Sequence, residues 1–77
     1  MSKPTRITNS IRALRFTQGE MTQAQLAQRI GVTRQTIIAI EQGRYSPSLE
    51  MAFQIARVFK VALDDVFQYP DGEAGPR

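Results

Sequence analysis

TQAQLAQRIGVTRQTIIAIEQG, residues 22–43, is the stretch that decides the fold. Its apolar residues recur every three or four positions, which predicts two short amphipathic helices joined by a tight turn. The hydroxyl of Thr22 can cap the first helix, and Gly31 can end it because glycine tolerates left-handed backbone. Val32 then fills a buried position. Four residues share the expected core face of this first helix: Ala24, Leu26, Ala27 and Ile30.

The second helix, residues 34–42, follows a cap at Thr33 and presents two different faces. At about 100° per residue, Ile37 and Ile40 point together into the core. Gln35, Ala39 and Gln42 point to the opposite side. The small side chain of Ala27 lets the two helices meet at a steep angle across a short turn. One face of the second helix is therefore free to contact another molecule.

This spacing resembles the helix-turn-helix of the XRE family, which includes the lambdoid phage repressors. Counting from Gln23 as the first motif position, the small residue of the motif falls at Ala27 and its turn glycine at Gly31. The core aliphatic positions of the motif fall at Leu26, Ile30, Ile37 and Ile40. With the following GRYSPSLEMAFQIARVF, the similarity to small stand-alone regulators spans about residues 9–69. It implies an all-α, five-helix, lambda-repressor-like DNA-binding domain.

Composition limits the chemistry of the chain. Its 77 residues make one domain, near the size at which folding buries only about 60% of the unfolded surface. Because histidine and cysteine are absent, we expect no catalytic residue, no metal site, no cofactor and no enzyme activity. The chain has no apolar run long enough to span a membrane and no apolar secretion signal. We therefore expect a cytoplasmic, nucleoid-associated protein that does not contact membranes.

The net charge of +3 is distributed unevenly. Residues 1–44 contain seven cations and two carboxylates, a balance of +5, and residues 45–77 contain three cations and five carboxylates, a balance of −2. A basic half that includes the motif is expected of a protein that binds a polyanion. A solvated surface of mixed charge is the alternative interpretation of this pattern.

Before the motif, residues 1–8 are expected to form an arm with a short strand at residues 6–8. Thr8 or Asn9 can cap a first helix that runs to about residue 18 and buries Ile11 and Leu14. Met21 is expected to be buried as well. Phe16 lies off the apolar stripe, so it either covers the edge of the core or contacts another chain.

After the motif, Ser46-Pro47 predicts the start of a fourth helix. The expected apolar face of this helix consists of Leu49, Ala52, Phe53, Ala56 and Phe59, widened by Ile55 and Val58. Lys60 and Ala62 stand where the family often has glycine and a capping serine or threonine, and each departure should cost about 1 kcal/mol. A fifth helix at residues 63–67 should turn Val66 and Phe67 inward.

A small antiparallel sheet would form if residues 6–8 paired with residues 67–69. Residues 70–77, PDGEAGPR, should be a disordered tail because they have no aliphatic residue larger than alanine. The folded domain is thus expected over residues 9–69.

The resemblance implies that the first turn of the second motif helix enters the DNA major groove, where base pairs are distinguishable. Arg34, Gln35 and Ala39 would then be the base-reading residues. Arg34 can pair with guanine and Gln35 with adenine, unless Arg34 is simply a solvated cation at the helix start. Ile38 lies beside this face and either touches a thymine methyl group or packs against a neighbouring loop.

Phosphate contacts would fix the position of this helix on the DNA. The resemblance implies that Gln23, which opens the first motif helix, clamps a phosphate. Four further candidates flank the groove: Thr36, Gln42, Arg44 and Tyr45. Lys3 and Arg6 could reach the DNA only if the arm is not paired as a strand. In phage repressors an arginine and a glutamate matching Arg15 and Glu41 form a structural ion pair, which we expect here.

These features favour a sequence-specific double-stranded DNA-binding transcriptional regulator, most often a repressor in this family. It would act as a homodimer on a two-fold symmetric operator, since one motif covers too little DNA for tight binding. The expected dimer residues are Ile7, Phe16, Phe67 and Tyr69. No small-molecule effector is implied. The alternative is an antitoxin or accessory protein-interaction module, which would need an exposed apolar patch beyond the dimer surface.

Overall fold

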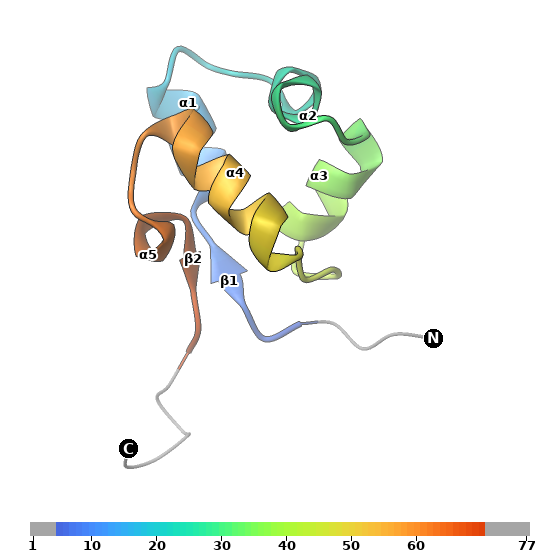
Figure 1. The fold of residues 1–77 in the computed structure, drawn as a ribbon, viewed down its shortest axis with the longest axis vertical. Coiled ribbons are helices and arrows are strands. Elements are labelled where there is room, and N and C mark those ends of the chain that lie inside the picture. The colour runs from blue at the N-terminus through green and yellow to red at the C-terminus, as the bar shows by residue number, and fades with distance from the viewer. Residues whose placement is uncertain (1–4, 71–77) are drawn as a thin grey trace.

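The computed structural model describes residues 5–70. Lys3 and the predicted tail, apart from Pro70, lie outside this range. The chain forms α1 (Ile11–Thr17), α2 (Gln23–Ile30), α3 (Arg34–Glu41), α4 (Leu49–Phe59) and α5 (Leu63–Val66), with strands β1 (Thr8–Asn9) and β2 (Phe67–Gln68) (Figure 1). The predicted five-helix fold with a small antiparallel sheet is confirmed.

One hydrophobic core lies between the helices, and α4 runs across it in front of α1 and α3 (Figure 1). All five helices contribute side chains that are essentially inaccessible to solvent, namely Ile11, Leu26, Ile37, Ile40, Ile55, Phe59 and Val66. Burying one such side chain stabilises the fold by about 1.5–3 kcal/mol. Met21 is buried as predicted and joins this core from the loop before α2.

Local hydrogen bonds set the ends of α2 and the start of α3, as predicted. The Thr22 hydroxyl accepts from the Gln25 amide, while the Gln25 side chain accepts from the Thr22 amide, forming a capping box. Gly31 ends α2 in the left-handed region at φ +77°. The Thr33 hydroxyl then accepts from the Thr36 amide at the start of α3. These contacts fix the turn between the two helices.

The start of α1 differs from the prediction, because neither Thr8 nor Asn9 occupies the N-cap position. Both residues belong to β1, and Ser10 precedes the helix without a side-chain capping bond. The Asn9 side chain instead accepts from the Ile11 amide and donates to the Ile40 carbonyl. The strand also lies later than predicted, at Thr8–Asn9 instead of residues 6–8, and it pairs with β2 through Thr8 opposite Gln68 and Asn9 opposite Phe67.

The start of α4 and its buried stripe also differ from the prediction. Ser48, not Ser46, caps the helix, and its hydroxyl accepts from the Met51 amide. Leu49 and Phe53 are 68% and 49% exposed, whereas Ile55 is fully buried. Phe53 lies about 160° around the helix from Ile55, so a stripe centred near Ile55 leaves it in solvent.

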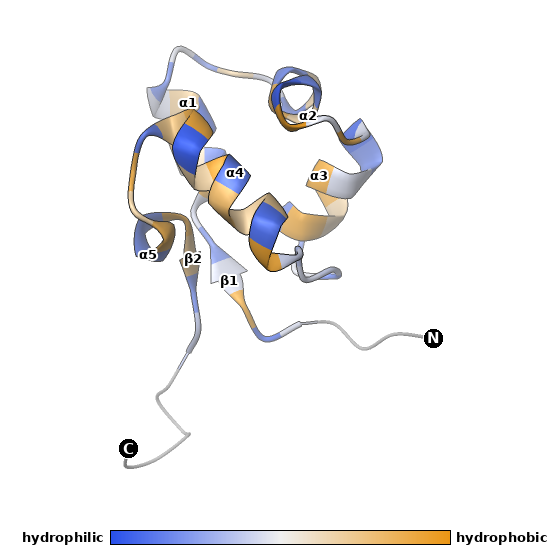
Figure 2. Ribbon diagram, in the orientation of Figure 1, coloured by the Kyte–Doolittle hydropathy of each residue, from blue (hydrophilic) through white to orange (hydrophobic). Residues whose placement is uncertain are grey.

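The same offset explains Ala24 in α2, which is exposed rather than part of the core face. Ala24 precedes the fully buried Leu26 by two residues, or about 160° around the helix. Figure 2 shows that polar and apolar residues alternate around the helices. Whether a residue at the edge of an apolar stripe is buried therefore depends on where the middle of that stripe lies on the helix.

The segment after α4 contains Lys60 and Ala62, the two residues that depart from the family's usual glycine and capping serine or threonine. Lys60 ends α4 in the left-handed region, at φ +59°. Ala62 precedes α5 and has no side-chain acceptor, although Asp65 Oδ2 accepts from its amide at 3.2 Å. Strand β2 then pairs with β1, with Gln68 opposite Thr8. This pairing brings the two ends of the described chain together.

Candidate nucleic-acid interface

The outer side of α3 is accessible within the part of the chain that the structure describes. Arg34 and Gln35 are exposed, and Ala39 and Ile38 are partly exposed. The two isoleucines on the opposite side of α3 are almost completely buried in the core. The two faces of α3 thus separate as the periodicity predicted, and residues of its first two turns are free to meet a ligand.

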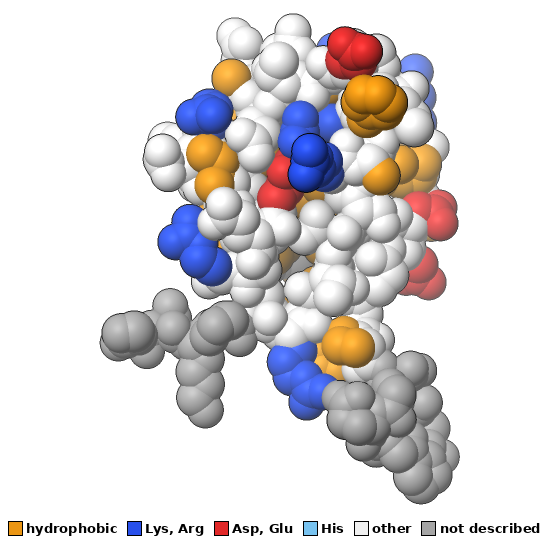
Figure 3. Space-filling model, turned by 180° about the vertical axis from the view of Figure 1, so that it is seen from behind, with side chains coloured by type: hydrophobic (Ala, Val, Ile, Leu, Met, Phe, Trp, Pro, Cys, Tyr) orange, Lys and Arg blue, Asp and Glu red, His pale blue; other side chains and the backbone are white. Residues whose placement is uncertain are grey.

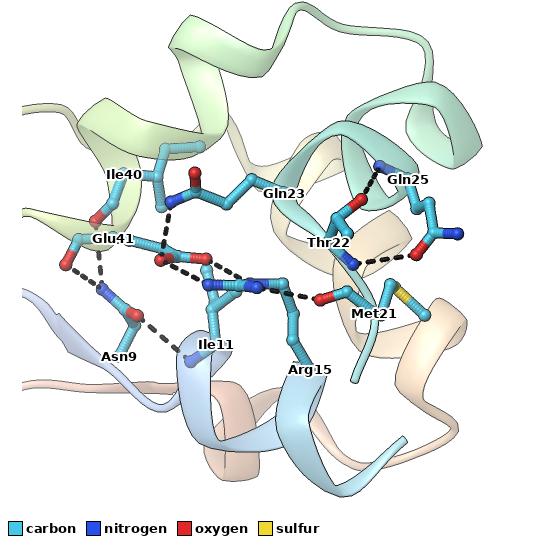
Figure 4. A network of polar contacts seen from close by, with 9 residues as sticks. All are labelled: Asn9, Ile11, Arg15, Met21, Thr22, Gln23, Gln25, Ile40 and Glu41. Atoms are coloured by element: carbon cyan, nitrogen blue, oxygen red, sulfur yellow. Dashed lines mark hydrogen bonds and ion pairs between the residues drawn. The ribbon is translucent and has the colours of Figure 1, made fainter. Parts of the chain in front are cut away.

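The last residue of α3 is held by an ion pair that joins it to α1 (Figure 4). Arg15 Nε and Nη2 donate to the two carboxylate oxygens of Glu41 at 2.7 and 3.1 Å. Arg15 Nη1 donates to the Met21 carbonyl at 2.8 Å. The two side chains are only 15% and 9% exposed. One arginine therefore joins α1, α3 and the loop before α2.

A third donor reaches the same carboxylate from α2. Gln23 Nε2 donates to Glu41 Oε1 at 3.1 Å, which holds the glutamine side chain against the end of α3 (Figure 4). Gln23 is also the first residue of α2, where backbone N–H groups lack partners within the helix and attract anions. Gln23, the predicted phosphate contact, is therefore already held in position by its hydrogen bond to the Glu41 carboxylate of the ion pair.

The other predicted phosphate contacts fall into two places. Thr36 lies in the first turn of α3, where its hydroxyl bonds that of Thr33 at 3.1 Å. Gln42, Arg44 and Tyr45 lie in the segment that follows α3, with Gly43 between the first two, and Arg44 Nε donates to Gln42 Oε1 at 2.9 Å. Tyr45 is 44% exposed. The structure thus places these residues at both ends of the exposed side of α3.

An open groove separates α1 from the N-terminal end of α2 and from α3. Its charged lining residues are Arg12, Arg15, Glu20, Arg34 and Glu41. The sequence analysis did not select Arg12, although its spacing of three residues from Arg15 puts both on one side of α1. Figure 3, a view from behind α4, shows basic side chains spread over this face, with acidic side chains at one edge and one acidic side chain beside the central basic ones.

The four predicted dimer residues do not all lie together. Ile7 precedes β1 and Phe67 belongs to β2; both are half-buried, and Phe67 packs on the core. Tyr69 follows the sheet, is 61% exposed and carries the Arg6 guanidinium 5.8 Å from its ring centre. Phe16 lies in the last turn of α1, is 69% exposed and lines the groove. Phe16 therefore does not cover the edge of the core.

Residues 5–70 contain neither a metal-binding cluster nor a membrane-spanning helix. No cluster of three or more Asp or Glu side chains there could hold a metal ion. None of the helices in this range is long and apolar enough to cross a bilayer.

Comparisons with known proteins agree with this geometry. The sequence model of the helix-turn-helix family matches residues 11–66. The uncharacterized HTH-type transcriptional regulator MJ0272 of Methanocaldococcus jannaschii is 57% identical over 53 residues, covering 69% of this chain and 80% of the relative. An uncharacterized HTH-type transcriptional regulator of Archaeoglobus fulgidus is 48% identical over 63 residues, covering 82% of this chain and 89% of the relative.

Solved structures share the fold. The crystal structure of the hypothetical transcription factor NHTF from Neisseria superposes with a TM-score of 0.68 at 25% identity, covering 83% of this chain and 72% of that one. A crystal structure from Bacteroides fragilis gives a TM-score of 0.70 at 22% identity, covering 80% of this chain and 98% of that one, and shows the fold alone. The family and these relatives indicate a DNA-binding protein, not an enzyme. The chain belongs to the XRE-type helix-turn-helix family.

Proposed function

We propose that this protein is a sequence-specific transcriptional regulator that binds double-stranded DNA through α3 and represses as a homodimer on a two-fold symmetric operator. The observation that carries the proposal is the exposed polar side of α3, presented by a helix whose opposite side is anchored in the core. The relatives, which are HTH-type transcriptional regulators, support a role in the regulation of transcription. A cytoplasmic location at the nucleoid follows from this proposal.

In the proposed complex, the first turn of α3 lies in the major groove. Arg34 donates two hydrogen bonds to guanine, and Gln35 pairs with the donor and acceptor of adenine. Ala39 and Ile38 offer apolar surface to thymine methyl groups. Each good two-bond contact discriminates against a wrong base by about 1–3 kcal/mol, so two such residues give useful specificity.

Phosphate contacts on both sides of α3 fix its position on the DNA. Gln23 and the free backbone N–H groups of α2 bind one phosphate. Gln42, Arg44 and Tyr45 bind the backbone on the other side, and Thr36 completes the set next to the first turn of α3. These contacts supply affinity without reading sequence.

A homodimer is proposed because one domain of this size covers too little DNA for tight specific binding. The sheet end of the molecule supplies the surface, through Ile7, Phe67 and Tyr69, with Phe16 as a separate candidate. A dimer bound to a promoter blocks polymerase without further machinery, which is why repression is proposed.

Selection of bound sequences from a pool of random duplexes tests this function. The expected product is a two-fold symmetric site with half-sites about 10 base pairs apart. Sedimentation analysis at tens of micromolar should show a dimer. Recovery of no preferred sequence, or a monomer at that concentration, would contradict the proposal.

A second candidate function is supported by Leu49 and Phe53, two large apolar side chains exposed one turn apart on α4. Such a pair suits an antitoxin or accessory module that binds a protein partner. A variant with Leu49→Gln and Phe53→Gln tests this idea. If it keeps DNA affinity and dimer mass but loses a co-purifying protein, the second function is supported. If the dimer becomes a monomer, α4 is instead part of the dimer surface.

A further inference from the structure

We infer that the groove between α1 and the N-terminal end of α2 takes a backbone phosphate of the bound DNA, with Arg12 as the cation that contacts it. The inference rests on the proposed function. It adds a contact from α1, a helix outside the helix-turn-helix, and thus a wider footprint on the DNA than α2 and α3 give alone.

The two arginines of α1 that line the groove differ in what their guanidinium groups can do. Arg15 donates to Glu41 and to the Met21 carbonyl, so its hydrogen-bonding capacity is committed within the protein. Arg12 lies one turn earlier on the same side of the helix, is exposed, and forms no hydrogen bond or ion pair within residues 5–70. Arg12 is therefore the guanidinium of α1 that is available to an external anion.

The surroundings of Arg12 suit the DNA backbone. The groove that it lines also contains Thr22 and Gln23 at the N-terminal end of α2, where free backbone N–H groups attract phosphate. Arg34, at the start of the proposed reading helix, lines the same groove. A strand whose bases meet α3 thus has a continuous path past α2 to Arg12.

The charge balance of the groove also favours an anion. Three of its lining residues are arginines and two are glutamates. The Glu41 carboxylate accepts hydrogen bonds from Arg15 and Gln23, so its charge is compensated inside the protein. With Arg15 and Glu41 paired, the remaining charged lining residues are the cations Arg12 and Arg34 and the carboxylate Glu20. The open part of the groove therefore has a net positive charge.

Salt dependence of DNA binding tests the inference without knowledge of the operator. Affinity for a fluorescein-labelled duplex of random sequence is measured from low to moderate salt for the wild type, Arg12→Gln and Arg57→Gln. Arg57 is a matched control because it is exposed on α4, away from the groove, and forms no ion pair within the described residues. Thermal unfolding of each variant checks that the fold is kept.

The loss of one phosphate contact lowers the slope of log affinity against log salt concentration by about 0.9 for each bound subunit. Across a fourfold rise in salt, wild-type affinity should then fall about 3.5-fold further than that of Arg12→Gln, per subunit. Arg57→Gln should keep the wild-type slope. Base preference in selected sites should be the same for all three proteins.

Equal slopes for Arg12→Gln and the wild type would overturn the inference, as would an equal reduction in Arg57→Gln. A changed base preference in Arg12→Gln would also overturn it, since a phosphate contact reads no sequence. These results differ from failure of the proposed function, in which the wild-type protein itself does not bind the duplex.

Discussion

Glu41, the last residue of α3, accepts two hydrogen bonds from Arg15 of α1, at 2.7 and 3.1 Å. The same carboxylate accepts a third from Gln23, the first residue of α2. One side chain thus fixes the relative positions of the proposed reading helix, the proposed phosphate-binding helix end and the scaffold helix. Because the pair is largely shielded from solvent, its loss should affect stability and DNA binding together.

Glu41→Ala should destabilise the domain by about 3 kcal/mol, because it leaves the mostly buried Arg15 guanidinium without its carboxylate. Urea unfolding, followed by circular dichroism, measures this change. Glu50→Ala, which removes an exposed carboxylate on α4, should alter stability by only about 0.5 kcal/mol. Similar losses in the two variants would show that Glu41 has no special structural role.

Gln23→Ala should weaken binding to every DNA sequence by a similar factor, because the proposed contact is to a phosphate and not to a base. A modest loss of stability, about 1 kcal/mol, should accompany it, since the hydrogen bond to Glu41 is also removed. Fluorescence anisotropy with selected and random duplexes measures the first effect. Gln28→Ala, at an exposed position further along α2, serves as the control. A sequence-dependent loss would argue for a base contact instead.

Arg34→Ala should relax base preference at one position of each half-site, at a cost of about 1–3 kcal/mol for the preferred base. The preferred base there should be guanine. Competition between the selected site and single-base variants measures the discrimination. Arg29→Ala, an exposed cation near the end of α2, should leave it unchanged. If Arg34→Ala weakens all sites equally, then Arg34 binds phosphate in the groove that it lines.

The α2–turn–α3 unit could be predicted from the sequence because its boundaries depend on neighbours in the chain. Thr22, Gly31 and Thr33 act within three or four residues of the amides and carbonyls that they satisfy. The starts of α1 and α4 could not be predicted in the same way. Alternative capping residues lie close together there: Thr8, Asn9 and Ser10 before α1, and Ser46 and Ser48 before α4. Before α1, Thr8 and Asn9 instead belong to β1, which pairs with the distant β2.

In the candidate site, too, some features follow from the local sequence and others depend on how distant parts of the chain pack. The exposure of Gln35 follows from helical periodicity, which is a local property. The hydrogen bonds from Gln23 to Glu41 and from Asn9 to the Ile40 carbonyl join residues 18 and 31 positions apart. Their formation depends on how α2, α3 and β1 pack together, and no spacing rule in the sequence specifies it. Arg12 was missed because an exposed arginine resembles any solvated cation until its groove is seen.

Lys60→Gly should stabilise the domain by about 1 kcal/mol, because glycine adopts the left-handed conformation at φ +59° without the steric cost of a side chain. For a domain of this size the melting temperature should rise by about 4–8 °C. Lys60→Ala is the matched control, since it removes the charge and the long side chain but keeps the Cβ atom. An equal rise in melting temperature in both variants would show that the gain comes from loss of the lysine side chain and not from the backbone conformation.

Ala62→Ser should also stabilise the fold, by about 1 kcal/mol, by supplying the capping oxygen that α5 lacks. The backbone at Ala62 already has the extended conformation of an N-cap residue, and Asp65 already accepts from its amide, so serine would complete a reciprocal capping arrangement. Differential scanning calorimetry measures the gain. Ala13→Ser, which adds a hydroxyl to an exposed position inside α1, should instead lower stability slightly, because serine is the poorer helix former. No gain at Ala62 would mean that the bond from Asp65 alone is enough to stabilise the start of this short helix.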